Sequence, residues 1–445
     1  MRAFCLGRAA LLAVVINVAC GARPELRADQ ASDAGADVAV DTGARDTGAD
    51  VQPPPPPPDP DPLTSKPIEI DLGVVAPDVP YTFTIPKNAV AFNVVVQGSP
   101  GTTVGVASMT SPLGRTVLEA FVPSGGNHEV TTNDDGIAAA EAPQTDAKGA
   151  YPIEAGTWTV RFGGPKNTKL RGSVTVQVTD DGAWHGGLLD VHFYVPDGVN
   201  LGAGPITAST APNDPEMKAR VAALFDRLAL VTALGRGKVK YHAIAARYAT
   251  LDTVDELYGS WQESKVVPDH TQGVHVVLTE QILSAQDGIW GIASGIPGAA
   301  ARTGTSASGV AMSFLASPEE DADALIHEIG HFMGLSHTTE FEKGWIDPLV
   351  DTPSCADMSQ SNLPKCPDAA DVMFPTLALA VDETAFTPSQ VLVYATNPAV
   401  RLWPNGTHKV TPPQKSWLGP PPAPSARARA MRCKTGVIRR PLSGP

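Results

Sequence analysis

The stretch HEIGHFMGLSH, residues 327–337, holds three histidines and one glutamate. On a helix, His327 and His331 lie four residues apart and project from the same face, with their Cβ atoms about 5–6 Å apart. Both rings can then reach one metal ion at about 2.0–2.1 Å, the length of a zinc–imidazole bond. Gly334 can adopt the left-handed conformation that ends a helix, so that His337 returns as a third ligand. The run predicts a catalytic zinc site whose fourth position is open to water.

Glu328 lies between the two helical histidines, where it can approach the metal without ligating it. Its carboxylate can take a proton from a zinc-activated water and hand it to a leaving amine, as general base and then general acid. The chain has ten histidines in 445 residues. With that composition, the run would arise by chance on the order of once in tens of thousands of sequences. Histidines that merely pack on a helix are therefore the weaker explanation.

The run resembles the zinc signature of the metzincin metallopeptidases, with every fixed position present. Downstream, Asp371-Val372-Met373-Phe374-Pro375 is similar to the metzincin Met-turn, in which a methionine forms an apolar floor beneath the zinc. Without the zinc run, Met373 would indicate ordinary core packing; together with it, the Met-turn is the better interpretation. The resemblance implies an α+β metallopeptidase domain over residues 186–405 and a protein or peptide substrate.

The loop between these motifs resembles the pappalysin-like branch, which has an Asp-Thr-Pro segment and cysteines in the same place. In that branch the loop also binds calcium, so Asp347, Asp351 and Thr352 are candidate ligands of a structural Ca²⁺. The alternative is that these residues cap turns or face solvent, since two carboxylates and one hydroxyl do not fill a calcium shell. Cys355 and Cys366 are the natural cysteine pair of the chain, and we expect a disulfide between them.

Several segments have the periodicity of regular structure. Residues 189–195 and 274–278 alternate like strands, and residues 214–231 have helical spacing. Ser317, followed by a proline and two glutamates, predicts the start of the zinc helix, which we expect to run from Pro318 to about Leu335. The metzincin resemblance implies that residues 308–314 form the edge strand that lines the cleft. Residues 386–390 and 397–398 fit a helix beneath the site.

Residues 65–185 alternate apolar and polar side chains between frequent turn residues. The segments 68–72, 81–85, 91–96, 157–162 and 174–178 are the predicted strands. This pattern predicts a separate all-β sandwich, jelly-roll-like in arrangement. The segments 81–86 and 156–160 are similar to the pre-peptidase sandwich domains found beside secreted bacterial proteases.

The N-terminus indicates export. Arginines flank a short apolar run, residues 9–19, which is too brief to span a membrane and is typical of a signal peptide. Residues 1–20 end at a site similar to a bacterial lipoprotein cleavage site, where Cys20 would be lipidated; ordinary cleavage after Ala22 is the alternative. Residues 21–64 are rich in Ala, Asp and Gly and then in Pro, which predicts a disordered tether. We expect a secreted protein or a lipoprotein of the bacterial cell surface or outer membrane.

The C-terminal tail, residues 406–445, has eight Lys or Arg and no Asp or Glu, whereas the whole chain carries a net charge of −14. It is rich in proline and is predicted to be disordered. Because we expect the protein to be exported, we expect no nucleic-acid partner.

The sequence therefore predicts a multidomain protein, an all-β sandwich followed by an α+β metzincin-like domain, that acts as an exported zinc endopeptidase. Two alternatives remain. In the first, the chain is a non-catalytic surface-binding lipoprotein whose zinc is structural; such zinc sites fill the fourth position with a protein ligand. In the second, the same site hydrolyses a non-protein bond at the cell surface.

Overall fold

The computed structural model describes residues 64–119, 132–133, 135–144, 153–202, 204–283, 289–314, 316–340, 347–359, 362–376 and 381–408. The predicted signal peptide with Cys20, the tether and most of the tail lie outside these ranges. In the described part, no helix has the length and apolar character needed to cross a membrane.

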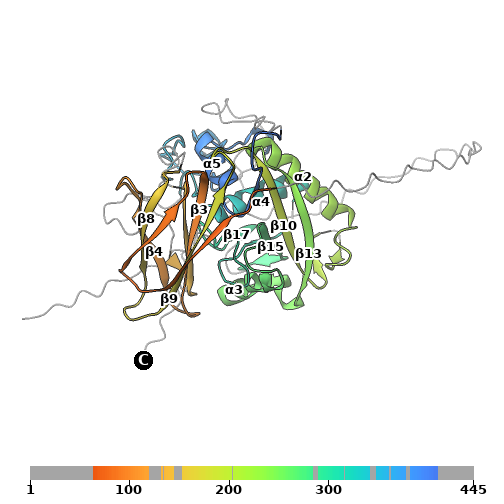
Figure 1. Cartoon of the computed structure of the whole chain (residues 1–445). Coiled ribbons are helices and arrows are strands. Elements are labelled where there is room, and N and C mark those ends of the chain that lie inside the picture. The colour runs from red at the N-terminus through yellow and green to blue at the C-terminus, as the bar shows by residue number, and fades with distance from the viewer. Residues whose placement is uncertain are drawn as a thin grey trace, which may run out of the picture. The chain divides into compact units, whose positions relative to one another are not determined.

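Two antiparallel sheets form the N-terminal part of the described chain (Figure 1). Their strands are β1 (Ile68–Val75), β2 (Pro80–Ile85), β3 (Ala89–Gln97), β4 (Val104–Thr110), β5 (Thr116–Glu119), β6 (Thr132–Asn133), β7 (Ile137–Ala142), β8 (Gly156–Gly163) and β9 (Leu170–Val178). One sheet has the order β1-β9-β3-β7, and the other has the order β2-β8-β4-β5 with β6 beside β4. The chain crosses between the sheets at most connections, as in a jelly roll.

The inner faces of the two sheets bury a core of their own. Phe92, Val94 and Val96 alternate along β3 and pack with Trp158 and Phe162 from β8. Alternation with a period of two places these side chains on one face of each strand. All five of the predicted sandwich strands are present, and each is longer than expected.

Part of the outer face of the β1-β9-β3-β7 sheet is also buried, which the sequence did not predict. Asn93, Glu141 and Gln177 point out of the sandwich, yet each is less than 5% exposed. They contact residues after position 296: Asn93 Nδ2 donates to the carbonyl of Gly298, and Gln177 Nε2 donates to that of Val400. The described residues accordingly fall within one compact unit. The sandwich has a separate core but docks on the rest of the chain through part of one sheet face.

The second half is built on a mixed sheet of order β13-β10-β15-β18-β17. Its strands are β10 (Gly187–Pro196), β13 (Gly235–Ile244), β15 (Val274–Leu278), β17 (Gly291–Ala293) and β18 (Val310–Met312), and β19 (Arg401–Leu402) pairs with β10. The strands β13, β10, β15 and β18 are parallel, whereas β17 is antiparallel to β18. Short pairs also form between β11 (Val199–Asn200) and β12 (Pro205–Ile206), and between β14 (Thr250–Leu251) and β16 (Gln281–Ile282).

The edge strand is not the one expected. Residues 308–314 contain β18, but β18 lies between β15 and β17 in the interior of the sheet. The edge strand is β17, which has only three residues and directly follows the buried Trp290. So short a segment has no measurable alternation, and sequence periodicity does not reveal it.

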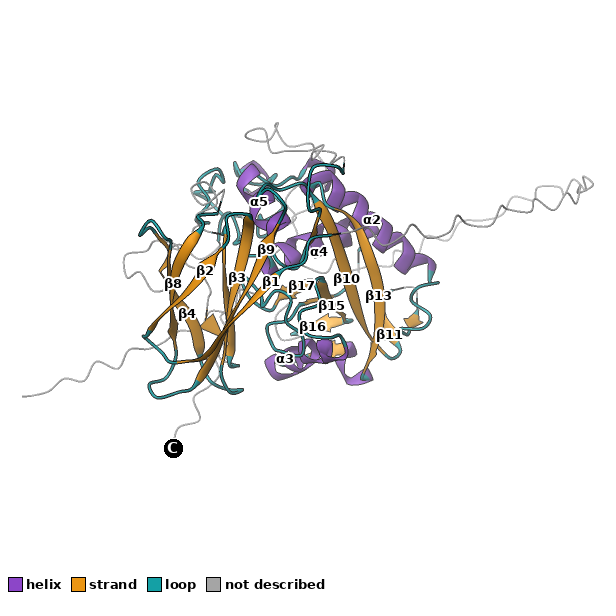
Figure 2. Ribbon diagram, viewed as in Figure 1, coloured by secondary structure: helices purple, strands orange, loops and turns teal. Residues whose placement is uncertain are grey.

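Helices cover both faces of this sheet (Figure 2). They are α2 (Pro215–Thr232), α3 (Val254–Gln262), α4 (Pro318–Phe332) and α5 (Pro388–Thr396). Val191 and Phe193 of β10 share a core with α2 and α4, whereas Tyr194, on the opposite face, shares one with α3. The sheet is thus buried on both sides, as parallel sheets usually are.

Candidate metal centre

Helix α4 carries the HEIGH residues, and its boundaries follow from local chemistry. Ser317 and Glu320 form a capping box: the Ser317 hydroxyl accepts from the Glu320 N–H, and the Glu320 carboxylate accepts from the Ser317 N–H, both at 3.3 Å. The helix ends at Phe332 rather than Leu335, because Gly334 has a φ of 98° and turns the chain. The predicted start is therefore confirmed, and the helix is shorter than predicted at its C-terminal end.

Two buried ion pairs fix α4 against α2. Arg220 Nε donates to Asp321 Oδ2 at 2.9 Å, and Arg227 Nε donates to Asp323 Oδ1 at 2.8 Å. Arg227 also donates to the Thr384 carbonyl at 2.8 Å. Because a buried charge that loses its partner is costly, these pairs hold the helix in one orientation.

The three histidine rings converge on one point. The Nε2 atom of His337 lies 3.1 Å from that of His327 and 3.1 Å from that of His331. Two nitrogens bound to one tetrahedral zinc are about 3.3–3.4 Å apart, given bonds of about 2.0–2.1 Å. All three side chains are buried. The structure thus brings together the three residues that the sequence selected as metal ligands.

The opposite nitrogen of each ring has a hydrogen-bond acceptor. His327 Nδ1 lies 2.6 Å from the Val372 carbonyl, His331 Nδ1 lies 2.7 Å from the Leu335 carbonyl, and His337 Nδ1 lies 2.8 Å from Glu340 Oε1. A carbonyl oxygen can only accept, so the first two Nδ1 atoms carry the proton. Glu340, which sequence reasoning missed, plays the same part for the third ring. Its position three residues after His337 was the available signal.

With Nδ1 protonated, the Nε2 lone pairs of His327 and His331 each face that of His337 within hydrogen-bond distance. Burial, with the neighbouring His337, lowers the pKa of His327 to about 3. Burial likewise lowers the pKa of His331 well below its ordinary value. Neutral imidazoles with oriented Nδ1–H groups are the ligands that zinc requires. The donor set therefore fits a zinc ion with three histidine ligands.

Glu328 is buried beside this triad and takes no part in it. Its carboxyl packs against Gly291 of β17, and its Oε2 atom has no hydrogen-bond partner in the described structure. Burial raises the pKa of Glu328 well above its ordinary range. A buried carboxyl without a partner is costly for stability, so its presence at this point favours a chemical role.

Gly291→Ala is expected to lower kcat by about 10²-fold while zinc stays bound. A Cβ at position 291 would lie 2.8 Å from Cδ and 2.9 Å from Oε1 of Glu328, so the carboxyl must shift. A displacement of about 1 Å in a reacting group can cost this factor. Steady-state kinetics and zinc analysis test it. Ile292→Val on the same strand, which faces the α3 core, is the control. Unchanged kcat in Gly291→Ala would contradict the placement of Glu328.

Met373 lies where a Met-turn residue is expected. It is fully buried, and its sulfur packs against Gly330 of α4, where a Cβ would lie only 2.6 Å away. The Thr338 N–H, next to His337, donates to the Met373 carbonyl at 3.2 Å. Asp371 Oδ1 accepts from the Met373 N–H at 2.7 Å and from Gln390 Nε2 at 3.0 Å. The segment is thus bonded to the third histidine's neighbour and to α5, the helix predicted beneath the site.

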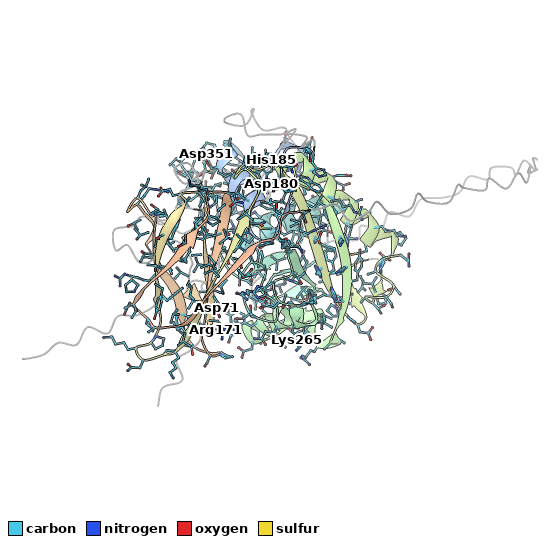
Figure 3. All side chains as sticks on the ribbon, in the orientation of Figure 1. Asp71, Arg171, Asp180, His185, Lys265 and Asp351 are labelled. Atoms are coloured by element: carbon cyan, nitrogen blue, oxygen red, sulfur yellow. A yellow bond between two sulfur atoms is a disulfide. The ribbon has the colours of Figure 1, made fainter. Side chains whose placement is uncertain are left out.

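The structure does not gather the predicted calcium ligands into one shell. Asp351 accepts from the Ser389 N–H at 2.9 Å at the start of α5, beside which it lies in Figure 3. The Thr352 hydroxyl donates to the Leu349 carbonyl at 2.7 Å, and Asp347 Oδ1 accepts from the Leu349 N–H at 2.8 Å. Burial raises the pKa of Asp347 to about 7. These contacts favour the capping and turn alternative.

The disulfide between Cys355 and Cys366 is present, with a Cα–Cα distance of 5.1 Å. It closes the segment that follows His337. The Cys355 N–H donates to the Thr339 hydroxyl at 2.7 Å, and that hydroxyl donates to Asp368. The disulfide loop is thereby bonded to Thr339, which lies two residues after the third histidine.

Residues 238–338 match the family model described as metallo-peptidase family M12B, reprolysin-like. No curated protein matches the chain. Among solved structures, archaemetzincin from Methanopyrus kandleri is similar at 16% identity, with 47% of this chain and 87% of that chain covered and a TM-score of 0.25. A TM-score this low does not establish a shared fold.

The matched segment ends one residue after His337 and so contains the whole zinc run. The family match covers the same three histidines that converge in the structure. Residues 238–338 are therefore similar to a reprolysin-like metallopeptidase, and the three histidines placed to hold one metal ion indicate a zinc metallopeptidase.

Proposed function

We propose that this chain is an exported zinc endopeptidase in which Glu328 is the general base and general acid. The observation that carries the proposal is the geometry of the centre: three oriented imidazoles converge, and a buried, unpaired carboxyl lies beside them. When bound, zinc would polarise the scissile carbonyl and lower the pKa of a water in its open position towards about 7. Glu328 would accept a proton from the attacking water and pass it to the leaving nitrogen.

Strand β17 provides a place for the substrate backbone. In the described part of the chain it pairs with β18 on one side, and its other side has no paired strand. An extended peptide can add to such an edge through main-chain hydrogen bonds. Since Gly291 of this strand packs against Glu328, a peptide aligned there would pass beside the carboxyl.

The test uses the purified full-length chain with a mixed peptide library. Cleavage is expected with zinc bound, is expected to stop after chelation, and is expected to return when zinc is restored. Cleavage sites within peptides, away from both ends, would identify an endopeptidase. If the folded, zinc-loaded protein cleaves cell-wall fragments but no peptide, the non-protein alternative holds. If it cleaves neither substrate, the binding-protein alternative replaces the proposal.

The structural-zinc alternative has less support. A structural zinc site closes its fourth position with a protein ligand. Among the described residues, the group of possible ligands at this point consists of His327, His331 and His337. We infer that the fourth position serves water and substrate.

We also propose that the domain is nearest to the pappalysin-like branch and that the chain is exported. Asp351-Thr352-Pro353 and the disulfide that follows support the branch. Disulfides persist in oxidising compartments, so the same bond supports export. Lipidation at Cys20 is tested by cell fractionation: Cys20→Ser is expected to move the protein from the membrane to the soluble exported fraction. An unchanged distribution would favour ordinary cleavage.

A further inference from the structure

Four strands of the sandwich present one polar row to the peptidase domain. Across the sheet, Glu69 pairs with Thr175, Thr175 with Asn93, and Asn93 with Glu141. Directly opposed residues on adjacent strands share a face and have Cβ atoms about 4.5–5.5 Å apart. Toward β7 the row becomes fully buried, where Asn93 and Glu141 meet the end of α4. An amide and a carboxyl are unusual at the centre of an apolar contact, because buried polar groups normally require hydrogen-bond partners.

Glu141 and the nearby Gln144 contact the turn that follows the zinc helix. Gln144 Nε2 donates to the Gly334 carbonyl at 3.3 Å and to the Ile296 carbonyl at 3.5 Å. The carboxyl of Glu141 packs on Gly334 so closely that a Cβ there would lie 2.5 Å from Oε1. Its other oxygen, Oε2, accepts from Asn397 Nδ2 at 2.6 Å. The sandwich thus holds this turn from outside the domain.

This turn positions two of the three metal ligands. The carbonyl of Leu335, one residue beyond Gly334, accepts from His331 Nδ1 and sets the orientation of that ring. His337 lies two residues further on. The carbonyl of Phe332 accepts from the Gly298 N–H at 2.9 Å, and the Gly298 carbonyl accepts from Asn93 Nδ2 at 3.4 Å. The end of α4 is therefore held through contacts that start on β3 and β7.

We propose that Glu141 and Gln144 of the β-sandwich are positioning residues for the metal site. They hold the Gly334 turn in place, and this turn orients His331 and His337. The inference rests on the proposed function in treating this centre as the active site. The sandwich then has a specific role, because it completes the support of the metal ligands, as hydrogen-bonded outer groups do in zinc proteins.

The chemistry of Glu141 makes glutamine its conservative substitute. Burial raises the pKa of Glu141 well above its ordinary range. Glu141 Oε1 and Asn93 Oδ1, on directly paired residues of neighbouring strands, both lack a hydrogen-bond partner in the described structure, and a proton on Oε1 would supply the missing donor. A glutamine amide supplies the same donor and the same acceptor without any charge.

The experiment measures zinc affinity by competition with a chromophoric chelator, together with the visible spectrum of the cobalt-substituted protein. Full-length Glu141→Ala and Gln144→Ala are each expected to bind zinc about 10–100-fold more weakly than the parent, the range found when outer hydrogen-bond partners of ligands are lost. Their cobalt spectra are expected to change, because the His331 and His337 rings are less well oriented. Glu141→Gln is expected to keep the affinity and spectrum of the parent.

Gln177→Ala is the matched control. Gln177 is a buried amide on the same sheet face, and it bonds to the carbonyls of Asn397 and Val400 rather than to the turn. It is expected to weaken docking and lower stability while zinc affinity stays within about twofold of the parent. If Glu141→Ala does not fold, Gln144→Ala decides alone.

Equal zinc affinities in Gln144→Ala, Gln177→Ala and the parent would overturn the positioning role. A Glu141→Gln variant that binds zinc as weakly as Glu141→Ala would also overturn it. Zinc affinity is read without any substrate. A parent that binds zinc tightly but cleaves no peptide would therefore refute the proposed function and leave the positioning role to be judged by these affinities.

Discussion

Glu328→Gln is expected to bind zinc like the parent and to hydrolyse peptides about 10²–10⁴-fold more slowly, the usual contribution of a general base or acid. Glutamine keeps the size of the side chain and its packing on Gly291. It cannot accept a proton from water. The change also replaces a carboxyl that is buried without a partner, so the melting temperature is expected to equal or exceed that of the parent.

Glu319→Gln provides the control for this prediction. It makes the same chemical change on the same helix, at an exposed position in the first turn. The parent, Glu328→Gln and Glu319→Gln are compared by three measurements: kinetics with one cleavable peptide, zinc analysis and a thermal melt. If Glu328→Gln kept the parent's kcat/KM, Glu328 would have no proton-transfer role. If it lost zinc, the carboxyl would belong to the metal's support instead.

The metal ligands could be predicted from the sequence because their geometry is local. His327 and His331 are neighbours on any helix, and the Ser317 capping box fixes where this helix begins. The return of His337 depends on Gly334, whose left-handed conformation is a backbone property of one residue. The same reasoning predicted β10, β15 and α2, in which periodicity extends over several residues.

Long-range packing set the limit of sequence reasoning. Strand β7 reads IAAAEA and, after Ile137, lacks the branched and aromatic residues that indicate strands, while β13 is interrupted by basic residues. Asn93, Glu141 and Gln177 look like solvent-facing residues of an alternating strand, and only the docked domain shows that they are buried. Glu340 and the Leu335 carbonyl become recognisable as orienting groups once the rings are placed.

A second cluster of histidines lies on the sheet face opposite α4, away from the metal ligands. His192 on β10 pairs with His275 on β15, and its Nδ1 lies 3.0 Å from Nε2 of His242 on β13. Tyr194 bonds to His275 Nδ1 at 2.8 Å, and Lys240 is the registered neighbour of His192. Three imidazoles therefore lie together with a cation at the neighbouring strand position. A proton added to His192 or His275 is opposed both by burial and by repulsion from the neighbouring charges.

Acidification from pH 7 to pH 5 is expected to lower the free energy of unfolding by about 4 kcal/mol through His192 and His275. Burial, with the adjacent histidines, lowers the pKa of His192 to about 4 and that of His275 to about 3, from 6.5. The unfolded chain binds more protons below pH 6.5, so this stability is complete above pH 6.5 and is lost as the pH falls towards the folded-state values. At pH 5 each ring accounts for about 2 kcal/mol.

Urea unfolding of zinc-free protein at the two pH values measures this loss. The zinc ligands also bind protons in this range, so the comparison is made with His275→Gln, which keeps a hydrogen-bonding partner for Tyr194 but does not titrate. Between pH 7 and pH 5, this variant is expected to lose about 2 kcal/mol less of its free energy of unfolding than the parent loses. This difference is the contribution of one ring. Equal losses in the two proteins would mean that His275 is protonated in the folded state, or that the cluster opens before the chain unfolds.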